Sequence, residues 1–449
     1  MNLDIVGEPE NLFIKLSDDI LPDPGAVLLT GITPQMTITD GLTEAEFLKY
    51  FYKNIATEGT IFVGYNNIRF DDEFIRFINY RNFYDAYEWH WSQQRSRWDM
   101  LDVVRMTRAL RPEGIEWSFA PDNTPSNRLE HLATVNKLVH DKAHDALSDV
   151  RATIALAQLL RTKQPKLFAY LLKYRDKKIL SEFVNSNKPF AYTSGKYPSK
   201  YLHTTVAINL GAHPKNQGVI VYDLRHDPQQ TIDLSEAEML ERWRHKCFER
   251  PCPHPRLPVK TMQFNRCPAV APFSVIDGTS AQRIQLDLKL VNNNYKKFQL
   301  LKNELYPKIL KVIEQLDQKQ AEIFSNEQLA ETALYDGFIP ETDKKLSQIL
   351  VNAAPNQLPS YIGKFEDKRL QSLLPLYISK NYPKLQTDEI RAHWEKFKTH
   401  KLLDGGDNSR GAAYFKQIAD KMNSTDITGQ QKYLLEELKL WGQSILPEV

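Results

Sequence analysis

Hydrophobic and polar positions along residues 1–163 alternate between short apolar runs and amphipathic stretches, which is typical of an α/β domain. The run IFVGYN at 61–66 predicts a buried strand, and the turn after it leads into a helical pattern over 71–80. The segment RWDMLDVVRMTRAL at 97–110 predicts a second helix, and KAHDALSDVRATIALAQLL at 142–160 predicts a third. The buried stripe expected of this third helix consists of Leu147, Val150, Ile154 and Ala157.

The pattern changes twice along the rest of the chain. Residues 165–321 carry short β-type runs separated by Gly, Pro and Asn turns, as in TTVAINLGAHPKNQGVIVYDL and RLPVKTMQFNRCPAVAP. Residues 325–449 are helical in pattern almost throughout. We therefore expect three domains in the 449-residue chain, divided near residues 164 and 321.

Composition narrows the class of protein. Hydrophobic residues make up 42% and charged residues 25%, which is ordinary for a globular protein. The sequence contains neither a run of about eighteen apolar residues nor a secretory signal, so we expect no membrane span. Three cysteines indicate a reducing cytoplasm. The net charge of +2 is too small to indicate a polyanionic partner by itself. A surface that binds nucleic acid must therefore be a local basic stripe.

Candidate chemistry lies at two places. Asp71 follows the predicted strand, and ligands of open α/β sheets bind beyond the carboxyl ends of the strands. His144 precedes the third predicted helix, and Asp149 lies in its first turn. Carboxylates suit Mg²⁺ that also binds phosphate oxygens, and a neutral histidine can take a proton from an attacking water. Acidic residues also favour the first turn of any helix, so a purely structural interpretation stays open.

Two further patterns bear on ligands. Arginines and aromatic residues alternate in the segment between Asp71 and His144. Aromatic rings can stack on unpaired bases and arginines can bind phosphates, so this pattern favours single-strand binding. We expect about half of these aromatic residues to be ordinary packing. The stretch HKCFERPCPHP holds two cysteines and two histidines, but their spacing differs from that of a zinc finger, so we interpret it as a rigid loop. The alternating residues are Arg76, Arg81, Arg95, Arg97, Arg105, Tyr84, Tyr87, Trp89 and Trp91.

Several motifs occur in one order: GYNNIRFDDE, NYRNFYDAY, SRWDMLDVVR, ALRPEGIEW, NRLEHL, AHDALSD, HPKNQGVIVYDL, LPVKTMQFNRCP and LYDGF. With these motifs the chain resembles bacterial exonuclease I, a DEDDh-type 3′→5′ exonuclease family of the ribonuclease-H-like superfamily. The resemblance covers nearly the whole chain. It implies an α/β ribonuclease-H-like nuclease domain over 1–164, an SH3-like β domain over 165–321 and an all-α C-terminal domain over 325–449, which together form a C-shaped clamp.

The resemblance also implies the activity. It is the processive 3′→5′ degradation of single-stranded DNA to 5′-mononucleotides in DNA repair and recombination, with two Mg²⁺ ions for which Mn²⁺ can substitute. Asp71 and Asp149 match the third and fourth acidic metal ligands, His144 matches the general base, and Arg128 matches a substrate-contacting arginine. Further positions match the DNA path: Arg76, Tyr87, Trp91, Arg105, Lys260 and Asn265.

A protein partner is implied as well. The family binds the acidic C-terminal tail of single-stranded DNA-binding protein, and Arg111, Tyr170 and Lys188 stand at matching positions. Another basic position of the family falls on acidic sequence around Asp277, so we expect this contact to be altered. We expect the protein to be a monomer.

One motif departs from the family. Its D-x-E pair lies on a first strand, upstream of the segment that reads VGEPENLFIKL here, and we expect this chain to lack that strand, two of the four carboxylates and much of its activity. Three hypotheses stay open: a gene start recorded too late, a clamp that binds single-stranded DNA without cutting it, and another phosphoesterase or RNA exonuclease. The first predicts that residues 1–449 are poorly soluble and inactive, and that upstream codons restore folding and cleavage.

Overall fold

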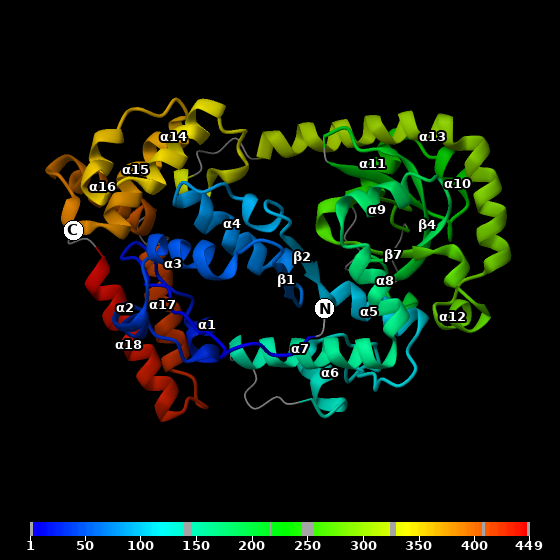
Figure 1. Ribbon diagram of the computed structural model, residues 1–449, viewed down its shortest axis with the longest axis horizontal. Coiled ribbons are helices and arrows are strands. Elements are labelled where there is room, and N and C mark those ends of the chain that lie inside the picture. Colours follow the sequence, from blue (N-terminus) through cyan, green and yellow to red (C-terminus); the bar gives the residue numbers. More distant parts are fainter. Residues whose placement is uncertain are drawn as a thin grey trace.

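A central α/β part lies between a β-rich part and a helical part in the computed structural model (Figure 1). The structure describes residues 3–138, 146–215, 217–244, 255–323, 329–405 and 409–446. The structure confirms the secondary-structure class expected of each part: α/β, β-rich and helical. The predicted boundary at residue 164 falls on Gln164, between two helices that pack on each other, and stays a prediction.

The central part is built on two parallel strands, β1 (Ile61–Gly64) and β2 (Ser96–Asp99), with Ile61 opposite Ser96. The strand expected at 61–66 is thus confirmed over 61–64, and the chain leaves the sheet after Gly64. Among the described residues β1 pairs with β2 along one edge, and a cavity runs along its other side. The helices of this part are α4 (Asp71–Arg81), α5 (Met100–Leu110), α6 (Leu129–Val135) and α7 (Ala146–Lys163).

The prediction of a helix over all of 97–110 is wrong at its start. Residues 96–99 are extended because they pair with β1, and Trp98 is buried in the core at 2% exposure. The helix α5 begins only at Met100, where the carboxylate of Asp99 accepts a hydrogen bond from the backbone N–H of Leu101 (2.9 Å). Asp99 is therefore both the end of a strand and the N-cap of a helix.

The predicted buried stripe of α7 is also partly wrong. Val150 is 54% exposed and lines the cavity beside β1, together with Ile154 and Ala157. The helix buries Ala157 as expected, but its other buried apolar residues are Ala152, Leu156 and Leu160. Both sets have helical spacing, and contacts with α5, α6 and α8 (Pro165–Lys173) decide which set is covered.

The β-rich part is a five-stranded antiparallel sheet with the strand order β6-β5-β4-β3-β7. The strands predicted in both turn-rich segments are confirmed, and the first two pair with each other, but the two strands of the second segment lie at opposite edges of the sheet, so their predicted pairing is wrong. The strands are β3 (Phe190–Thr193), β4 (Thr204–Ala212), β5 (Gly218–Asp223), β6 (Val259–Gln263) and β7 (Ala269–Pro272). The helices around it are α9 (Lys177–Val184), α10 (Pro228–Ile232), α11 (Glu236–Arg244), α12 (Gly278–Arg283) and α13 (Leu288–Ile323).

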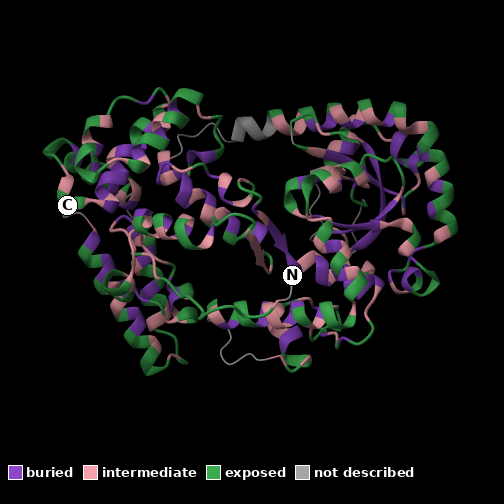
Figure 2. Ribbon diagram, in the orientation of Figure 1, coloured by how far each residue is buried: buried purple, intermediate pink, exposed green. Residues whose placement is uncertain are grey.

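One hydrophobic core joins the α/β part to the sheet. It includes Met106 of α5, Leu156 of α7, Phe168 of α8, Ile208 of β4 and Phe298 of α13. Figure 2 shows the strands of the sheet largely buried, while the outer face of α13 is exposed. The shared core makes the α/β part and the sheet one packed body.

The helical part is confirmed over most of 325–449. Its helices are α14 (Glu341–Asn352), α15 (Lys368–Asn381), α16 (Asp388–Leu403), α17 (Arg410–Met422) and α18 (Gly429–Ile445). The beginning of the chain packs on this part, which the sequence pattern did not indicate: Val27 shares a core with Tyr414 and Leu435. The N-terminal helices are α1 (Pro24–Thr30), α2 (Pro34–Asp40) and α3 (Glu44–Tyr50), and the π-helical turn Phe51–Ile55 follows them.

A buried ion cluster stabilises the joint between the N-terminal segment and the helical part. The carboxylate of Asp19 pairs with the ammonium groups of Lys380 (2.9 Å) and Lys401 (2.5 Å), and Glu331 pairs with the same two lysines. Burial alone would raise the pKa of Asp19, but the two lysines outweigh it and hold this pKa well below its usual range. The cluster ties the N-terminal segment, α15, α16 and the 3₁₀ turn Ala330–Tyr335 together.

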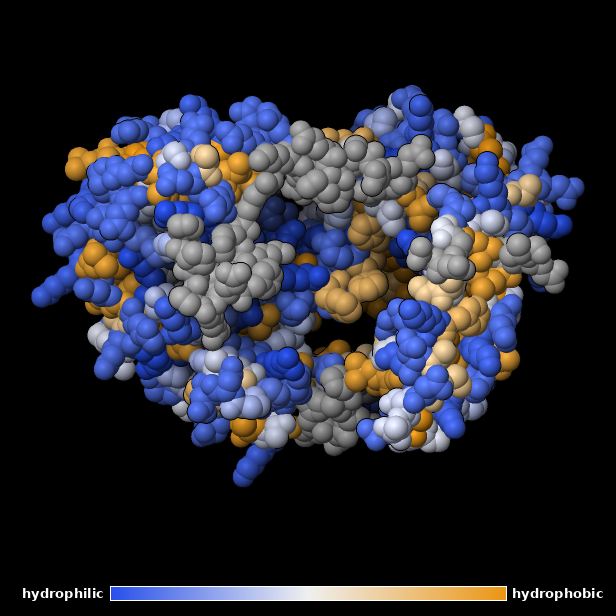
Figure 3. Space-filling view, turned by 180° about the vertical axis from the view of Figure 1, so that it is seen from behind, coloured by the Kyte–Doolittle hydropathy of each residue, from blue (hydrophilic) through white to orange (hydrophobic). Residues whose placement is uncertain are grey.

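The three parts surround a hollow near the middle of the molecule, with hydrophobic side chains on part of its rim (Figure 3). This arrangement agrees with the expected clamp. No described helix combines the length and the apolar character needed to cross a membrane.

Candidate active site

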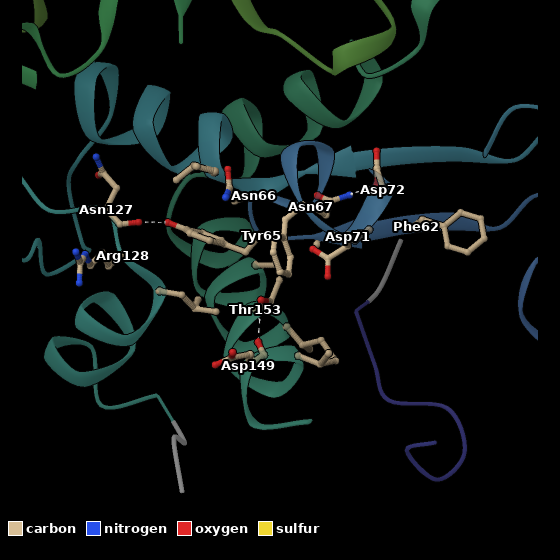
Figure 4. Close-up of a pocket in the computed structure, with 18 of the residues that line it drawn as sticks. Phe62, Tyr65, Asn66, Asn67, Asp71, Asp72, Asn127, Arg128, Asp149 and Thr153 are labelled. Carbon is tan, nitrogen blue, oxygen red and sulfur yellow. Dashed lines mark hydrogen bonds between the residues drawn. The ribbon is translucent and has the colours of Figure 1, made fainter. Parts of the chain in front are cut away.

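A cavity of about 1290 Å³ lies beside β1, between the start of α4 and α7. Phe62–Gly64 of β1 and Ile75 of α4 form one wall, and Val150, Ile154 and Ala157 form the other. Polar side chains gather where β1 ends, as expected for the carboxyl end of a strand. They are Asn66, Asn67, Asp71, Asn127, Arg128 and Asp149 (Figure 4).

Asp71 is the first residue of α4, and the acidic run Asp71-Asp72-Glu73 suits the positive end of the helix dipole. The chain reaches this start through Asn66, which takes a left-handed conformation (φ 64°) that asparagine tolerates better than most residues. The Asp71 side chain lies in the cavity and points toward α7 (Figure 4). Partial desolvation by the cavity walls raises its pKa.

Asp149 reaches the same cavity from the first turn of α7. Its backbone carbonyl accepts a hydrogen bond from the hydroxyl of Thr153 (2.8 Å), one turn further along the helix. Its carboxylate is exposed. The structure therefore brings together Asp71 and Asp149, which the sequence separates by 78 positions.

The chemistry of these two carboxylates fits a divalent cation. Magnesium is commonly held by one or two carboxylates together with phosphate oxygens of the substrate. In the part of the chain that the structure describes, no three His, Cys, Asp or Glu side chains gather closely enough to hold a metal ion by themselves. Asp71 and Asp149 thus suit a cation that the substrate completes, rather than a closed protein cage.

Two sequence predictions fall outside the described residues. His144, the predicted general base, lies in the segment 139–145, just before α7. The stretch with Cys247 and Cys252 lies in the segment 245–254. Both stay predictions.

Arg128 lines the cavity at the N-cap of α6, and its guanidinium is largely exposed, with Glu130 at 3.6 Å. The loop before Arg128 is held in place by Arg108 of α5, a residue that the sequence analysis did not identify. The Arg108 guanidinium donates to the carbonyls of Ser118 (2.9 Å) and Ser126 (2.6 Å). Burial lowers the pKa of Arg108 to about 10.

A second support of this loop comes from the residue that follows β1. The hydroxyl of Tyr65 donates to the carbonyl of Asn127, the residue before Arg128 (Figure 4). The rings of Trp117 and Phe119 lie 5.4 and 4.9 Å from the Arg108 guanidinium. Its position on the buried face of α5, as an arginine among apolar residues, is the sequence signal that could have identified Arg108.

The neighbour of Asp71 is fixed by a buried ion pair. Asp72 and Arg97 of β2 pair with 2% and 4% of their side chains exposed. The Asp72 carboxylate also accepts from the Asn67 amide (3.2 Å), and the Arg97 guanidinium donates to the carbonyl of Asn265. The start of α4 is thereby connected to the turn Phe264–Arg266 of the β-rich part.

The predicted DNA-path residues are placed differently from one another. Trp91 and Tyr87 are 62% and 39% exposed, so their rings are accessible to bases. Arg76 is buried at 5% exposure, pairs with Glu73, and lies 5.5 Å from the centre of the Tyr87 ring. Arg76 is therefore not exposed to solvent, and it packs against the ring of Tyr87. Arg105 lines the cavity and pairs with Asp102 (2.7 Å).

The two β-domain residues also differ. Lys260 is partly buried, and its ammonium donates to the hydroxyl of Tyr192 (2.8 Å). Burial lowers the pKa of Lys260 well below its usual value, and the charges of Lys196 and Arg69 lower it further. Asn265 is exposed, and its carbonyl accepts from Arg97.

The predicted partner-binding residues lie outside this cavity. Arg111 ends α5 and pairs with Asp277 at 3.6 Å, so the acidic residue noted in the sequence takes part of the charge of Arg111. Tyr170 of α8 stacks on Tyr174, with ring centres 4.2 Å apart. Lys188 is exposed before β3.

Comparison with known proteins agrees with this geometry. Residues 2–157 match the exonuclease family model, residues 175–315 the exonuclease I SH3-like domain, and residues 328–445 the exonuclease I C-terminal domain. Exodeoxyribonuclease I of Haemophilus influenzae is 36% identical over 99% of this chain and 93% of its own length. The Escherichia coli enzyme is 38% identical over 84% of this chain and 79% of its own length.

Solved structures give the same result. Exonuclease I from Methylocaldum szegediense matches with a TM-score of 0.90 and 37% identity, over 99% of this chain and 93% of that one. E. coli exonuclease I in complex with a dA16 oligonucleotide matches over the same shares with a TM-score of 0.90 and 34% identity. A further match is a zinc-bound form of the E. coli enzyme with single-stranded DNA, at a TM-score of 0.88 and 33% identity, over 99% of this chain and 93% of that one. The chain therefore belongs to the exonuclease I family.

Proposed function

We propose that this protein is a metal-dependent exonuclease that removes 5′-mononucleotides from the 3′ end of single-stranded DNA. The observation that carries the proposal is the convergence of Asp71 and Asp149 on one cavity, with Arg128 on its rim. Solved family members described as complexes with oligonucleotides support the substrate.

Each residue has a distinct part in this proposal. Asp71 and Asp149 hold Mg²⁺, two ions in the family pattern, and a bound ion neutralises phosphate charge and stabilises the attacking and leaving oxygens. Arg128 orients the terminal phosphate, because its exposed guanidinium can bind two phosphate oxygens at once. His144 takes the proton from the attacking water, as predicted from its place before α7.

The wider surface supports a single strand rather than a duplex. Exposed Trp91 and Tyr87 offer ring faces to unpaired bases, while the protein as a whole carries a net charge of only +2. We propose that the acidic tail of single-stranded DNA-binding protein binds at Arg111, Tyr170 and Lys188, and a solved complex described as SSB/Exonuclease I supports this. The small number of cysteines supports a cytoplasmic setting.

A second candidate is a clamp that binds single-stranded DNA without cutting it. The observation in its favour is that no three His, Cys, Asp or Glu side chains among the described residues gather closely enough to hold a metal ion, although Asp71, Asp72, Glu130 and Asp149 line the cavity. Such a clamp would still use Trp91, Tyr87 and Arg128. It would leave Asp71 and Asp149 without a role.

One experiment separates the two candidates. The protein is incubated with Mg²⁺ and single-stranded DNA labelled at its 3′ end, with duplex DNA and single-stranded RNA as competitors. The exonuclease releases labelled mononucleotide from the first reaction times onward. Tight binding without release of label supports the clamp instead.

A further inference from the structure

A second, smaller cavity of about 110 Å³ lies between the α/β part and the five-stranded sheet. Asn66, Leu101 and Arg105 line both this cavity and the active-site cavity, so the two adjoin. Its remaining lining comes from the turn after β1, the start of α5, the loop after β3, and the segment from β6 to the turn after it. The basic residues among all these are Arg69, Arg105, Lys196, Lys260 and Arg266.

The carboxylates of this cavity are already engaged. Asp99 accepts from the backbone N–H groups of Asn66 and Leu101, both at 2.9 Å. Asp102 pairs with Arg105 at 2.7 Å. Neither carboxylate therefore forms an ion pair with the other four cations. Burial lowers the pKa of Lys260, and the charge of Asp102 opposes this shift.

Three of these cations are exposed and have no carboxylate within ion-pairing distance among the residues that the structure describes. They are Arg69, Lys196 and Arg266. Partial desolvation lowers the pKa of Lys196, and the charges of Arg256, Arg69 and Arg266 lower it further. Positive charges that converge on one cavity from three separate loops repel one another, and an anion between them removes that repulsion.

Unpaired surface lysines and arginines usually form a solvated face. Here they border a concave site between two packed parts of the protein. Its volume suits a phosphate group with a few waters and excludes a nucleoside. Because it shares a wall with the active-site cavity, one continuous strand can reach both.

We propose that this cavity binds a backbone phosphate of the single-stranded substrate, next to the cleavage position, through Arg69, Lys196 and Arg266. The inference rests on the proposed function, in which Arg128 binds the terminal phosphate. It assigns a binding site to another phosphate of the same strand. It makes these three residues positioning residues, which hold a strand longer than one nucleotide in register with Asp71 and Asp149.

The test is binding without cleavage. The triple variant Arg69→Gln/Lys196→Gln/Arg266→Gln is titrated with fluorescent oligothymidylate in the presence of EDTA at several salt concentrations. We expect affinity at low salt to fall about tenfold, and the log–log salt slope to become shallower by about 0.7 per lost phosphate contact. The matched control is Lys200→Gln, an exposed lysine near Lys196 that does not line the cavity, and it should bind like the parent.

A second variant keeps the test decisive. Arg69→Lys/Arg266→Lys retains the charges and should bind within about threefold of the parent, so a loss confined to the neutral variant reports charge rather than misfolding. Unchanged affinity and salt slope in the neutral variant overturn the inference. Inorganic phosphate is titrated as the other source of the same group. If the neutral variant loses phosphate binding but keeps oligonucleotide binding, the cavity takes free phosphate and the strand assignment is wrong.

Failure of the proposed function gives a different result. If the parent never releases nucleotides, the exonuclease proposal is wrong. If the neutral variant nevertheless binds the oligonucleotide more weakly and with a shallower salt dependence than the parent, the phosphate site is still supported.

Discussion

The guanidinium of Arg97 is paired with the carboxylate of Asp72, the residue next to Asp71, and both side chains are buried. Arg97 also donates to the carbonyl of Asn265, so one side chain sets the start of α4 relative to the five-stranded sheet. The orientation of Asp71 therefore depends on a contact between two parts of the protein.

This ion pair predicts a large effect on stability. Replacing Arg97 with alanine leaves Asp72 buried and uncompensated, which should lower the free energy of unfolding by about 3–5 kcal/mol. Removing the exposed pair of Arg391 and Asp388 by Arg391→Ala should change it by less than about 1 kcal/mol. Urea denaturation of both variants measures the difference, and equal effects would refute the role of burial.

Arg108 predicts a defect in substrate binding. The variant Arg108→Gln removes the cation that binds the carbonyls of Ser118 and Ser126, so the loop before Arg128 loses its support. We expect KM for single-stranded DNA to rise about tenfold or more with a smaller change in kcat, because Arg128 is misplaced rather than removed. The control is Arg410→Gln in the helical part, which should keep both parameters. A fall in kcat at constant KM would contradict this role.

The ion cluster at the joint predicts a pH dependence. Burial alone would raise the pKa of Asp19 and of Glu331, but Lys380 and Lys401 hold both pKa values below the usual range. The folded state thus binds protons less readily than the unfolded state. The stabilisation is present above the unfolded pKa values of about 3.9 and 4.3, and is lost as the pH falls below them.

Thermal unfolding between pH 7 and pH 3 measures this effect. The parent should lose Tm steeply below about pH 5, and Asp19→Asn should be less stable at pH 7 and lose less on acidification. Parallel curves for parent and variant would show that the cluster does not supply the acid-sensitive stability.

His144 predicts a loss of rate without a loss of binding. His144→Ala should slow hydrolysis by about 10²- to 10⁴-fold, because the water loses its general base, while affinity for single-stranded DNA in EDTA stays the same. His393→Ala, on α16, is the matched control. Cleavage by His144→Ala at the parent rate across neutral pH would return His144 to a structural role.

The sequence predicted the architecture well and the packing less well. Turn residues and apolar runs were sufficient to find β4, β5, β6 and β7 as strands, and local turn chemistry fixes β4 and β5 as antiparallel neighbours. They did not indicate that β6 and β7 lie at opposite edges of the sheet, because long-range pairing decides that order. They were insufficient at 96–99, where pairing with β1 overrides helical spacing. They were also insufficient for Val150, since periodicity identifies an apolar stripe without saying whether a neighbour covers it.

The candidate site was predictable only in part. Asp71 and Asp149 could be found because a strand end and a helix start leave recognisable signals. The role of Arg97 could not be found, since it binds the carboxylate of Asp72 and a carbonyl of a distant segment. Arg108 left one signal, its place among the apolar residues of α5, but not the carbonyls that it binds. The contact between the N-terminal helices and α17 and α18 also joins the two ends of the chain, a separation over which a sequence pattern carries no information.

The most direct test of the central claim uses Asp149 and a DNA strand labelled at its 5′ end. With Mg²⁺, the parent should shorten this strand progressively from the 3′ end, and EDTA should stop the reaction. Asp149→Asn should lose the metal-dependent reaction by at least about 10³-fold while it binds the strand as the parent does, and Glu116→Gln, an exposed control, should cleave normally. Metal-dependent shortening by Asp149→Asn at the parent rate would contradict the account.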